Sequence, residues 1–346
     1  MEKLKEWKGY KKGVNLGGWF SQCPMTEDNY RGFINKEDFA KIASWGCDHV
    51  RLPIDFELLT APDGTYIESG FAHVQDAIDW AKENGLNIIL DLHKADGYSF
   101  DEATGATGFF DNVSLQEKFY DLWEHIAQRF GNMSDFVAFE LLNEVTDKSY
   151  CEPWNRILTI CIERIRKIAP VTKILIGGYW NNSINAVADL PEFDDDNIIY
   201  NFHCYSPIIF THQGAHWIKE MPLDFRWAFD HSYEELDEQN VKMFPNNKGA
   251  FDMMPDKKAK LGAEYFEKQF GEYVDIVIRR GKPLYCGEYG VIDLADAKDA
   301  LEWYKAINAT FEKFGIGRAA WSYRRMNFGL EGEHYASVID ELVKYL

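Results

Sequence analysis

Short apolar runs of strand length alternate along the chain with segments in which apolar residues recur at helical spacing. The runs predict strands at residues 13–17, 48–53, 87–93, 137–143, 173–178, 198–205, 283–289 and 318–323. The helical spacing predicts helices near residues 36–45, 70–84, 115–130, 153–168, 182–189, 262–280, 296–314 and 336–345. Eight repeats of strand and amphipathic helix close most naturally into a (β/α)8 TIM barrel, so the predicted fold class is α/β. An open doubly wound sheet is the alternative, but the chain lacks the Gly-rich phosphate loop that marks many such sheets.

One predicted connection is far longer than the few residues that a βα loop normally needs. It runs from about residue 206 to residue 261 and contains Trp217, Trp227 and a short helical pattern at 232–241. Long loops in compact domains are usually functional, so we interpret this one as an insertion on the active face of the barrel. No Ser-rich or Pro-rich linker, repeat or low-complexity tract separates a second domain, so residues 1–346 are predicted to form a single catalytic domain.

Polar and aromatic residues gather at the C-terminal ends of the predicted strands. They are Arg51 in HVRLP, His93 in IILDLH, Asn143 and Glu144 in FELLNE, His203 and Tyr205 in NFHCYSP, Glu288 in PLYCGEYG, and Trp321 in AAWSY. Because the C-terminal strand ends of a barrel share one face, these residues are predicted to converge there. Each of them alone has a structural explanation, as an ion pair, a buried histidine or core packing. Their joint occurrence at six strand ends favours a functional site.

Composition narrows the class of ligand. Lys and Arg number 37 against 56 Asp and Glu, and the formal net charge of -19 disfavours nucleic acid and anionic membranes and suits a neutral substrate. Aromatic residues make up 15% of the chain, and their flat faces pack well against sugar rings, although a large aromatic core would also explain them. The six cysteines are dispersed without a C-x-x-C pair, which predicts free thiols rather than a zinc site or a disulfide scaffold.

The opening segment, MEKLKEWKGYKKGVNLGG, is charged and has no apolar core of the kind found in signal peptides. No later apolar run approaches the length of a transmembrane helix. If Met1 is the natural start, we expect a cytoplasmic protein. Removal of a preceding signal peptide would instead make it a secreted one.

The combination of HVRLP, DLH, LLNE, HCY, GEYG and AAW resembles the retaining glycoside hydrolases of family 5, and the resemblance extends from Val14 to the segment after Trp321. It implies one catalytic Glu after the fourth strand and another after the seventh. Glu144 would then be the acid/base and Glu288 the nucleophile of a double displacement through a glycosyl-enzyme. The family commonly has Pro after the fourth-strand Glu, whereas this chain has Val145.

Other residues that match the family's motifs would support the two carboxyl groups. Arg51 and Tyr205 would donate hydrogen bonds to Glu288 and keep it ionised. His203 would contact Glu144 and hold its proton ready for transfer.

Further residues of the resemblance would contact the sugar. Asn143 would bind the 2-OH, His93 would supply another polar contact, and Trp321 would form the floor beneath the ring. Four other tryptophans are possible subsite residues: Trp19, Trp180, Trp217 and Trp227. The reaction calls for no metal and no organic cofactor.

The resemblance implies an oligo- or polysaccharide substrate, with β-glucans or β-gluco-oligosaccharides as the leading class. A transglycosylase, or a hydrolase of β-mannan or another β-glycoside on the same site, is the alternative. A non-catalytic carbohydrate-binding barrel is a second alternative, but it would be expected to lack one of the two carboxylates. An intracellular enzyme would act on short oligosaccharides in a partly closed pocket, because polymers do not enter cells.

Overall fold

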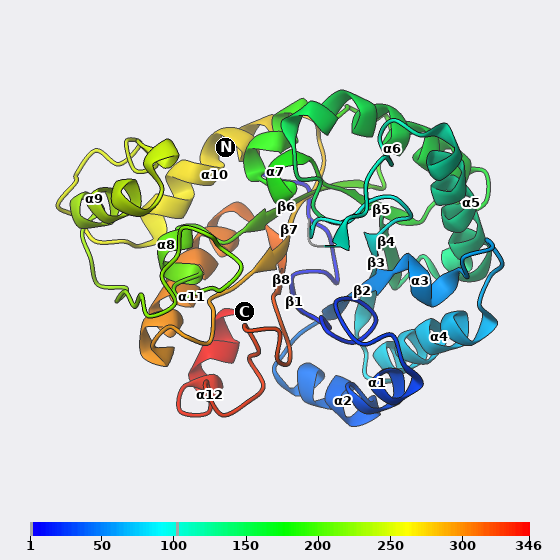
Figure 1. The fold of residues 1–346 in the computed structure, drawn as a ribbon, viewed down its shortest axis with the longest axis horizontal. Helices are drawn as coiled ribbons and strands as arrows, with labels where there is room; N and C mark the ends of the chain where they lie inside the picture. Colours follow the sequence, from blue (N-terminus) through cyan, green and yellow to red (C-terminus); the bar gives the residue numbers. More distant parts are fainter. Residues whose placement is uncertain (1–2, 102–103) are drawn as a thin grey trace.

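The computed structural model describes residues 3–101 and 104–346. Its parallel strands close into a barrel in which β8 pairs with β1 (Figure 1). The strands are β1 (Lys12–Asn15), β2 (His49–Asp55), β3 (Asn87–Lys94), β4 (Val137–Glu140), β5 (Lys173–Ile176), β6 (Ile198–Cys204), β7 (Leu284–Tyr289) and β8 (Gly317–Ala320). The predicted (β/α)8 TIM barrel is therefore confirmed. Strand β4 is shorter than predicted, so Asn143 and Glu144 lie in the loop that follows it.

Long helices surround the barrel where helical periodicity predicts them. They are α2 (Lys36–Ser44), α4 (Glu68–Glu83), α5 (Val113–Phe130), α6 (Cys151–Arg166), α10 (Ala263–Arg279) and α11 (Ala297–Phe314). The shorter helices are α1 (Glu27–Gly32), α3 (Phe56–Leu59), α7 (Tyr179–Asn182), α8 (Ile208–Thr211), α9 (Tyr233–Met243) and α12 (Ile339–Leu342). Single turns of 3-10 helix add η2 (Gly131–Met133), η3 (Lys148–Tyr150), η5 (Pro245–Asn247) and η6 (Val343–Tyr345), and a longer one is η4 (Ile184–Asp189).

The predicted helix at 182–189 differs in kind, and the predicted helix at 336–345 is shorter than expected. The first is replaced by a left-handed turn in α7 followed by η4, because Ser183 ends the turn and its side chain accepts a hydrogen bond from the Asn185 N–H. Ser and Asn side chains that bond to nearby backbone compete with α-helix. The second segment is reduced to the short α12 and η6.

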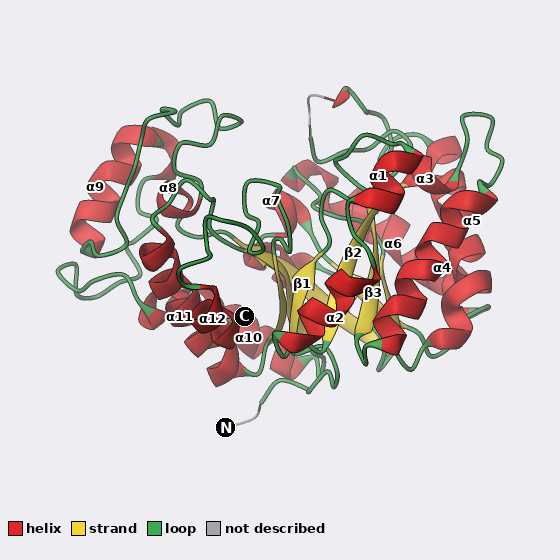
Figure 2. Cartoon of the chain, turned by 90° about the horizontal axis from the view of Figure 1, so that it is seen from below, coloured by secondary structure: helices red, strands yellow, loops and turns green. Residues whose placement is uncertain are grey.

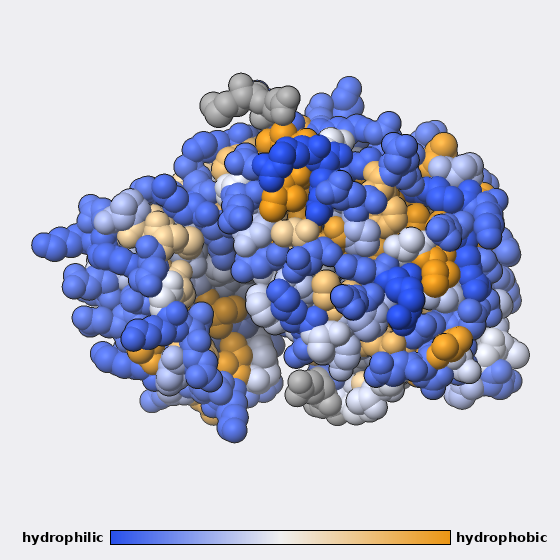
Figure 3. All heavy atoms as spheres, turned by 90° about the horizontal axis from the view of Figure 1, so that it is seen from above, coloured by the Kyte–Doolittle hydropathy of each residue, from blue (hydrophilic) through white to orange (hydrophobic). Residues whose placement is uncertain are grey.

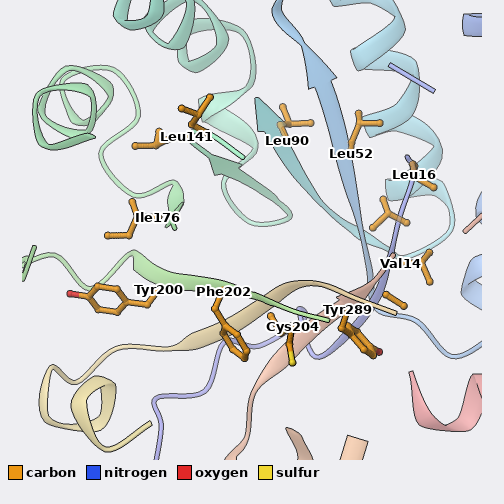
Figure 4. Packing of buried hydrophobic residues seen from close by; sticks show 14 of the residues in the cluster. Val14, Leu16, Leu52, Leu90, Leu141, Ile176, Tyr200, Phe202, Cys204 and Tyr289 are labelled. Atoms are coloured by element: carbon orange, nitrogen blue, oxygen red, sulfur yellow. The ribbon is translucent and has the colours of Figure 1, made fainter. Parts of the chain in front are cut away.

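The core has an outer and an inner part. Figure 4 shows Leu52, Leu90 and Phe202 among the strand residues of the outer cluster, which packs against the surrounding helices. The inner cluster fills the barrel and consists of Trp7, Tyr10, Ile89, Ala138, Leu175, Ile199, Tyr285 and Ala319. Side chains two positions apart on a strand face the same side, so Ile89 is followed inside the barrel by Asp91 and His93. Apolar residues thus plug one part of the barrel and polar residues occupy its C-terminal end.

The segment between β6 and α10 stands beside the barrel and contains α8, α9 and η5 (Figures 1 and 2). Aromatic contacts hold it against α10, since the rings of Tyr233 and Phe251 lie 6.2 and 5.5 Å from that of Tyr265. Its predicted helical piece at 232–241 is confirmed as α9. Its description as an insertion stays a prediction.

The face in Figure 3 is mostly hydrophilic, with apolar residues in scattered patches. None of the helices in the described part of the chain combines the length and the apolar content that crossing a membrane demands. All six cysteines are free thiols, as predicted.

Candidate active site

Arg51 on β2 occupies the centre of the polar end of the barrel and is completely buried. Its Nε and Nη2 atoms donate to the two carboxyl oxygens of Glu140 at 2.7 and 2.8 Å. Nη1 donates to Glu288 Oε1 at 2.8 Å, and Nη2 lies 2.9 Å from Asp91 Oδ2. One buried guanidinium therefore joins carboxyl groups from β3, β4 and β7.

Burial and ion pairing act in opposite directions on this cluster. Burial lowers the pKa of Arg51, but the nearby carboxylates of Asp91, Glu140 and Glu288 outweigh it, so the pKa stands well above its ordinary value. Burial raises the pKa of Asp91 to about 7, although Arg51 opposes the rise. The pKa of Glu140 is also raised by burial. Arg51 is therefore a permanent positive charge at the base of the site.

Glu288 lies on β7 with a donor at each carboxyl oxygen. Arg51 contacts Oε1, and the Tyr205 hydroxyl donates to Oε2 at 2.8 Å. Burial raises the pKa of Glu288, while His203 and Arg51 lower it. The preceding Gly287 is required by close packing, because a Cβ there would lie 2.8 Å from Asn201 Oδ1.

Glu144 lies in the loop after β4 in a left-handed conformation, with φ of 39°. Its Oε1 lies 2.8 Å from His203 Nδ1, and its Oε2 accepts a hydrogen bond from Asn181 Nδ2 at 3.1 Å. The Tyr98 hydroxyl braces the loop by donating to the Glu144 carbonyl at 2.7 Å and accepting from the Thr146 N–H at 2.9 Å. Burial raises the pKa of Glu144, and the hydrogen bond from Asn181 opposes the rise.

Glu144 and Glu288 face each other across a short gap. One ligand atom from each of Glu144, His203 and Glu288 lies within 4.8 Å of the others. Retaining glycosidases hold their carboxyl groups about 5 to 5.5 Å apart, whereas inverting ones leave about 6.5 to 9.5 Å for a water molecule. The spacing here is of the retaining kind. Among the described residues, this trio is also the group whose atoms could hold a metal ion.

Asn143, His93 and Trp321 border the same space. Asn143 Oδ1 accepts from Arg51 Nη2 at 2.9 Å, and its Nδ2 lies 3.4 Å from His93 Nε2. His93 Nδ1 lies 2.6 Å from Asp91 Oδ2, and burial lowers the pKa of His93 to about 4, so this imidazole is neutral at pH 7. The Trp321 ring lies parallel to that of His93, with centroids 5.8 Å apart and an angle of 6° between the planes.

The family profile of the cellulases, glycosyl hydrolase family 5, matches residues 7–327 of the chain. The chain belongs to glycoside hydrolase family 5. Cellodextrinase A of Ruminococcus flavefaciens is 43% identical over 311 residues, which cover 90% of this chain and 84% of the relative. Endoglucanase C of Acetivibrio thermocellus is 35% identical over 341 residues, covering 97% and 98%. The solved structure of Thermotoga maritima Cel5A in complex with mannotriose is 24% identical, covers 97% of both chains and has a TM-score of 0.76, which shows a shared fold.

This family 5 enzyme is an O-glycosyl hydrolase. Two of its predicted subsite tryptophans lie at the rim of the site. Trp180 is 50% exposed and immediately precedes Asn181, the partner of Glu144. Trp217 is 45% exposed, and its ring lies 6.3 Å from Phe328, which belongs to the apolar cluster around Trp321.

The other two predicted subsite tryptophans of the enzyme pack against other aromatic rings. Trp19 is 1% exposed and stacks on Phe20 and on Trp80 of α4, at 4.1 and 6.0 Å. The prediction that Trp19 lines a sugar subsite is wrong, because its ring faces the helices that cover the barrel. Trp227 stacks on Phe225 and His231 within its own segment, so its subsite role stays a prediction.

Several polar residues of the hydrolase site were not predicted from the pattern of polar residues at strand ends. Asp91 and Asn201 lie two positions before His93 and His203, on the same strands and on the same inner face of the barrel. A search for polar residues at this spacing of two would have found both. Glu140 lies inside an apolar run, where a charged residue signals a buried ion pair. Asn181 lies in a turn, and no periodic signal marks it.

Proposed function

We propose that the enzyme hydrolyses β-1,4-linked gluco-oligosaccharides with retention, using Glu144 as acid/base and Glu288 as nucleophile. The observation that carries this proposal is the approach of their carboxyl groups to within 4.8 Å. Their partners distinguish the roles. Glu288 receives a hydrogen bond from the cation Arg51, whereas Glu144 contacts neutral groups, so Glu288 ionises first and Glu144 keeps its proton.

The reaction then proceeds in two balanced steps. In the first, Glu144 donates its proton to the glycosidic oxygen while a Glu288 oxygen attacks the anomeric carbon, and the leaving alcohol departs. In the second, the Glu144 carboxylate takes a proton from water as the water oxygen attacks the anomeric carbon. The bond to Glu288 breaks, the sugar leaves with its original anomeric configuration, and both carboxyl groups return to their starting states.

Hydrogen-bond partners define what each neighbouring residue offers the sugar. Asn143 uses its oxygen for Arg51 and directs one amide N–H toward His93 Nε2, so its other N–H can donate to the 2-OH. His93 donates from Nδ1 to Asp91, so its Nε2 is the acceptor, which a sugar hydroxyl would share with Asn143 Nδ2, 3.4 Å away. Trp321 supplies the apolar surface under the ring.

The similarity to a cellodextrinase and an endoglucanase supports β-glucans, and short cellodextrins fit the rim best. Trp180 lies on the side of Glu144, where the leaving group departs, and Trp217 lies on the side of Trp321. Aromatic rings on both sides are suited to a few sugar residues spanning the two carboxyl groups.

We further propose that residues 1–346 form one catalytic domain that acts on imported cellodextrins in the cytoplasm. The closed barrel and the packing of the segment 206–261 against α10 support the single domain. The net charge of -19 supports a neutral saccharide over nucleic acid or an anionic membrane as the partner. Fractionation of the producing cells, followed by assay of the medium and the lysate, tests the location.

The substrate is tested with cello-, laminari-, manno- and xylogluco-oligosaccharides assayed beside the matching polymers. We expect the highest kcat/KM on cellodextrins and release of mono- or disaccharides from them. Fast random cleavage in the middle of a polymer would contradict the preference for short chains. Faster hydrolysis of another oligosaccharide class would overturn the proposed linkage.

A further inference from the structure

Three consecutive residues after β5 adopt the left-handed conformation. Trp180, Asn181 and Asn182 have φ values of 51°, 56° and 55°. Residues other than glycine seldom take this conformation, although Asn tolerates it better than most. Such strain persists only where the surroundings impose it, and it gathers at functional sites. The turn therefore needs an explanation in terms of what it holds.

The turn is tied to the loop that carries Glu144. The Trp180 N–H donates to the Thr146 carbonyl at 3.1 Å, and the Asn181 N–H donates to the Val145 carbonyl at 2.9 Å. These acceptors are the two residues that directly follow Glu144. The turn and the acid/base loop consequently form one hydrogen-bonded unit.

Asn181 contacts one carboxyl oxygen of Glu144 directly, and Asn182 is linked to the other oxygen through His203. Asn181 Nδ2 donates directly to Oε2 at 3.1 Å. Asn182 is completely buried, and its Nδ2 lies 3.4 Å from His203 Nε2, while His203 Nδ1 lies 2.8 Å from Glu144 Oε1. When Asn182 donates to Nε2, His203 carries its proton on Nδ1 and donates it to Glu144. Space around Asn182 is tight, because a Cβ on Gly177 would lie 2.3 Å from its Oδ1.

We propose that Asn181 and Asn182 are positioning residues that set the proton affinity of Glu144, Asn181 by direct donation and Asn182 by fixing the tautomer of His203. The inference rests on the acid/base role proposed above for Glu144. Donors at both oxygens favour the carboxylate and offset the effect of burial. The group is thus kept able to lose its proton in the first step and to accept one in the second.

Other charged and titratable groups also face Glu144. They are Arg51 on β2, Asp91 and His93 on β3, Tyr98 after β3, His203 and Tyr205 at the end of β6, and Glu288 on β7. Variants of Asn181 leave all of these side chains in place. A change in the titration of Glu144 in such variants therefore reports the amide itself.

The test is the pH dependence of kcat/KM, whose alkaline limb reports the free enzyme's essential acid. Phenyl cellobioside needs protonation of its leaving group, and dinitrophenyl cellobioside does not. Asn181→Gly removes the side-chain amide, and glycine adopts the left-handed conformation without strain. This variant should shift the alkaline limb for phenyl cellobioside to higher pH by about 0.5 to 1 unit. Asn181→Asp places a carboxylate beside Glu144 and should move it further. The alkaline limb of the kcat/KM profile for dinitrophenyl cellobioside should stay where it is in the wild type. The control is Asn185→Ala, at an exposed residue on η4, which should change neither pH profile.

The tautomer is tested by Asn182→Asp. Its carboxylate accepts from His203 Nε2–H, so the ring proton should move from Nδ1 to Nε2, as observed in the 15N NMR spectrum of the imidazole. An unmoved alkaline limb in both folded Asn181 variants, or a His203 proton already on Nε2 in the wild type, would overturn the inference and leave the role of Glu144 intact. Wild-type activity of Glu144→Gln on phenyl cellobioside would instead show that the role of Glu144 itself is wrong.

Discussion

Glu140→Gln removes one charge from the buried Arg51 cluster without changing the shape of the side chain. Glu140 Oε2 accepts from Arg51 Nε at 2.7 Å, and Oε1 accepts from Arg51 Nη2 at 2.8 Å and from Asn201 Nδ2 at 2.9 Å. The single oxygen of Gln can occupy only one of these positions. Placed at Oε1 it keeps two hydrogen bonds, but its NH2 group then faces the N–H of Arg51 Nε.

The cost of this substitution follows from burial. Both side chains of the pair are fully buried, so solvent does not screen the interaction. Hydrogen bonds to charged groups contribute about 1.5 to 3 kcal/mol each, and breaking a buried ion pair costs about 3 to 5 kcal/mol. We expect the free energy of unfolding to fall by about 3 to 5 kcal/mol at neutral pH. A tilt of Arg51 would also shift Glu288, and misplacement by about 1 Å lowers kcat by up to about 100-fold.

Urea unfolding followed by tryptophan fluorescence measures the stability, and cellodextrin hydrolysis measures kcat. The matched control is Glu152→Gln, an exposed Glu in the first turn of α6, which should change the unfolding free energy by less than about 0.5 kcal/mol. If Glu140→Gln were as stable as this control, the buried ion pair would not hold the site together as we infer.

Two further predictions concern the reaction and the pH dependence of folding. Glu144→Gln and Glu288→Gln should each lower kcat on unactivated cellodextrins by at least about 100-fold and leave the circular dichroism spectrum unchanged. Azide should partly restore the activity of Glu144→Ala on dinitrophenyl cellobioside. Wild-type turnover by either Gln variant would refute the assignment. Asp91 has its pKa raised to about 7, against about 3.9 in an unfolded chain, so between these values the folded enzyme holds a proton that the unfolded chain has lost. The unfolding free energy of the wild type should therefore fall relative to that of Asp91→Asn as the pH rises from about 4 to 7, and parallel stability curves would contradict this.

The sequence predicted the barrel well because hydrophobic periodicity sets which face of each strand and helix is buried. The rule that strand ends share one face then led to Arg51 and Glu288, which lie 2.8 Å apart in the structure. The rule works for groups on regular strands. The choice of Trp19 as a subsite residue did not rest on this rule, and it failed because aromatic content alone does not tell whether a ring after a Gly-Gly turn faces the sugar site or the helices.

Turns were the other source of failure. The apolar residues between 182 and 189 suggest an α-helix. Instead, residues 180–182 are left-handed and residues 184–189 form the 3-10 helix η4. The left-handed conformation delivers Asn181 to Glu144. Neither the turn nor this contact has a periodic pattern, since both depend on hydrogen bonds to the distant loop at Val145 and Thr146.

The central claim is that Glu288 forms a covalent bond to the sugar during turnover. In a 2-deoxy-2-fluoro cellobioside, the fluorine slows both formation and hydrolysis of the glycosyl-enzyme. A reactive leaving group speeds only the formation step, so the glycosyl-enzyme accumulates. Peptide mapping by mass spectrometry should then find one fluorosugar per enzyme molecule, on the peptide containing Glu288 and absent from Glu288→Gln. A label on Glu144, or full turnover of the reagent with inversion and no label, would contradict the double displacement.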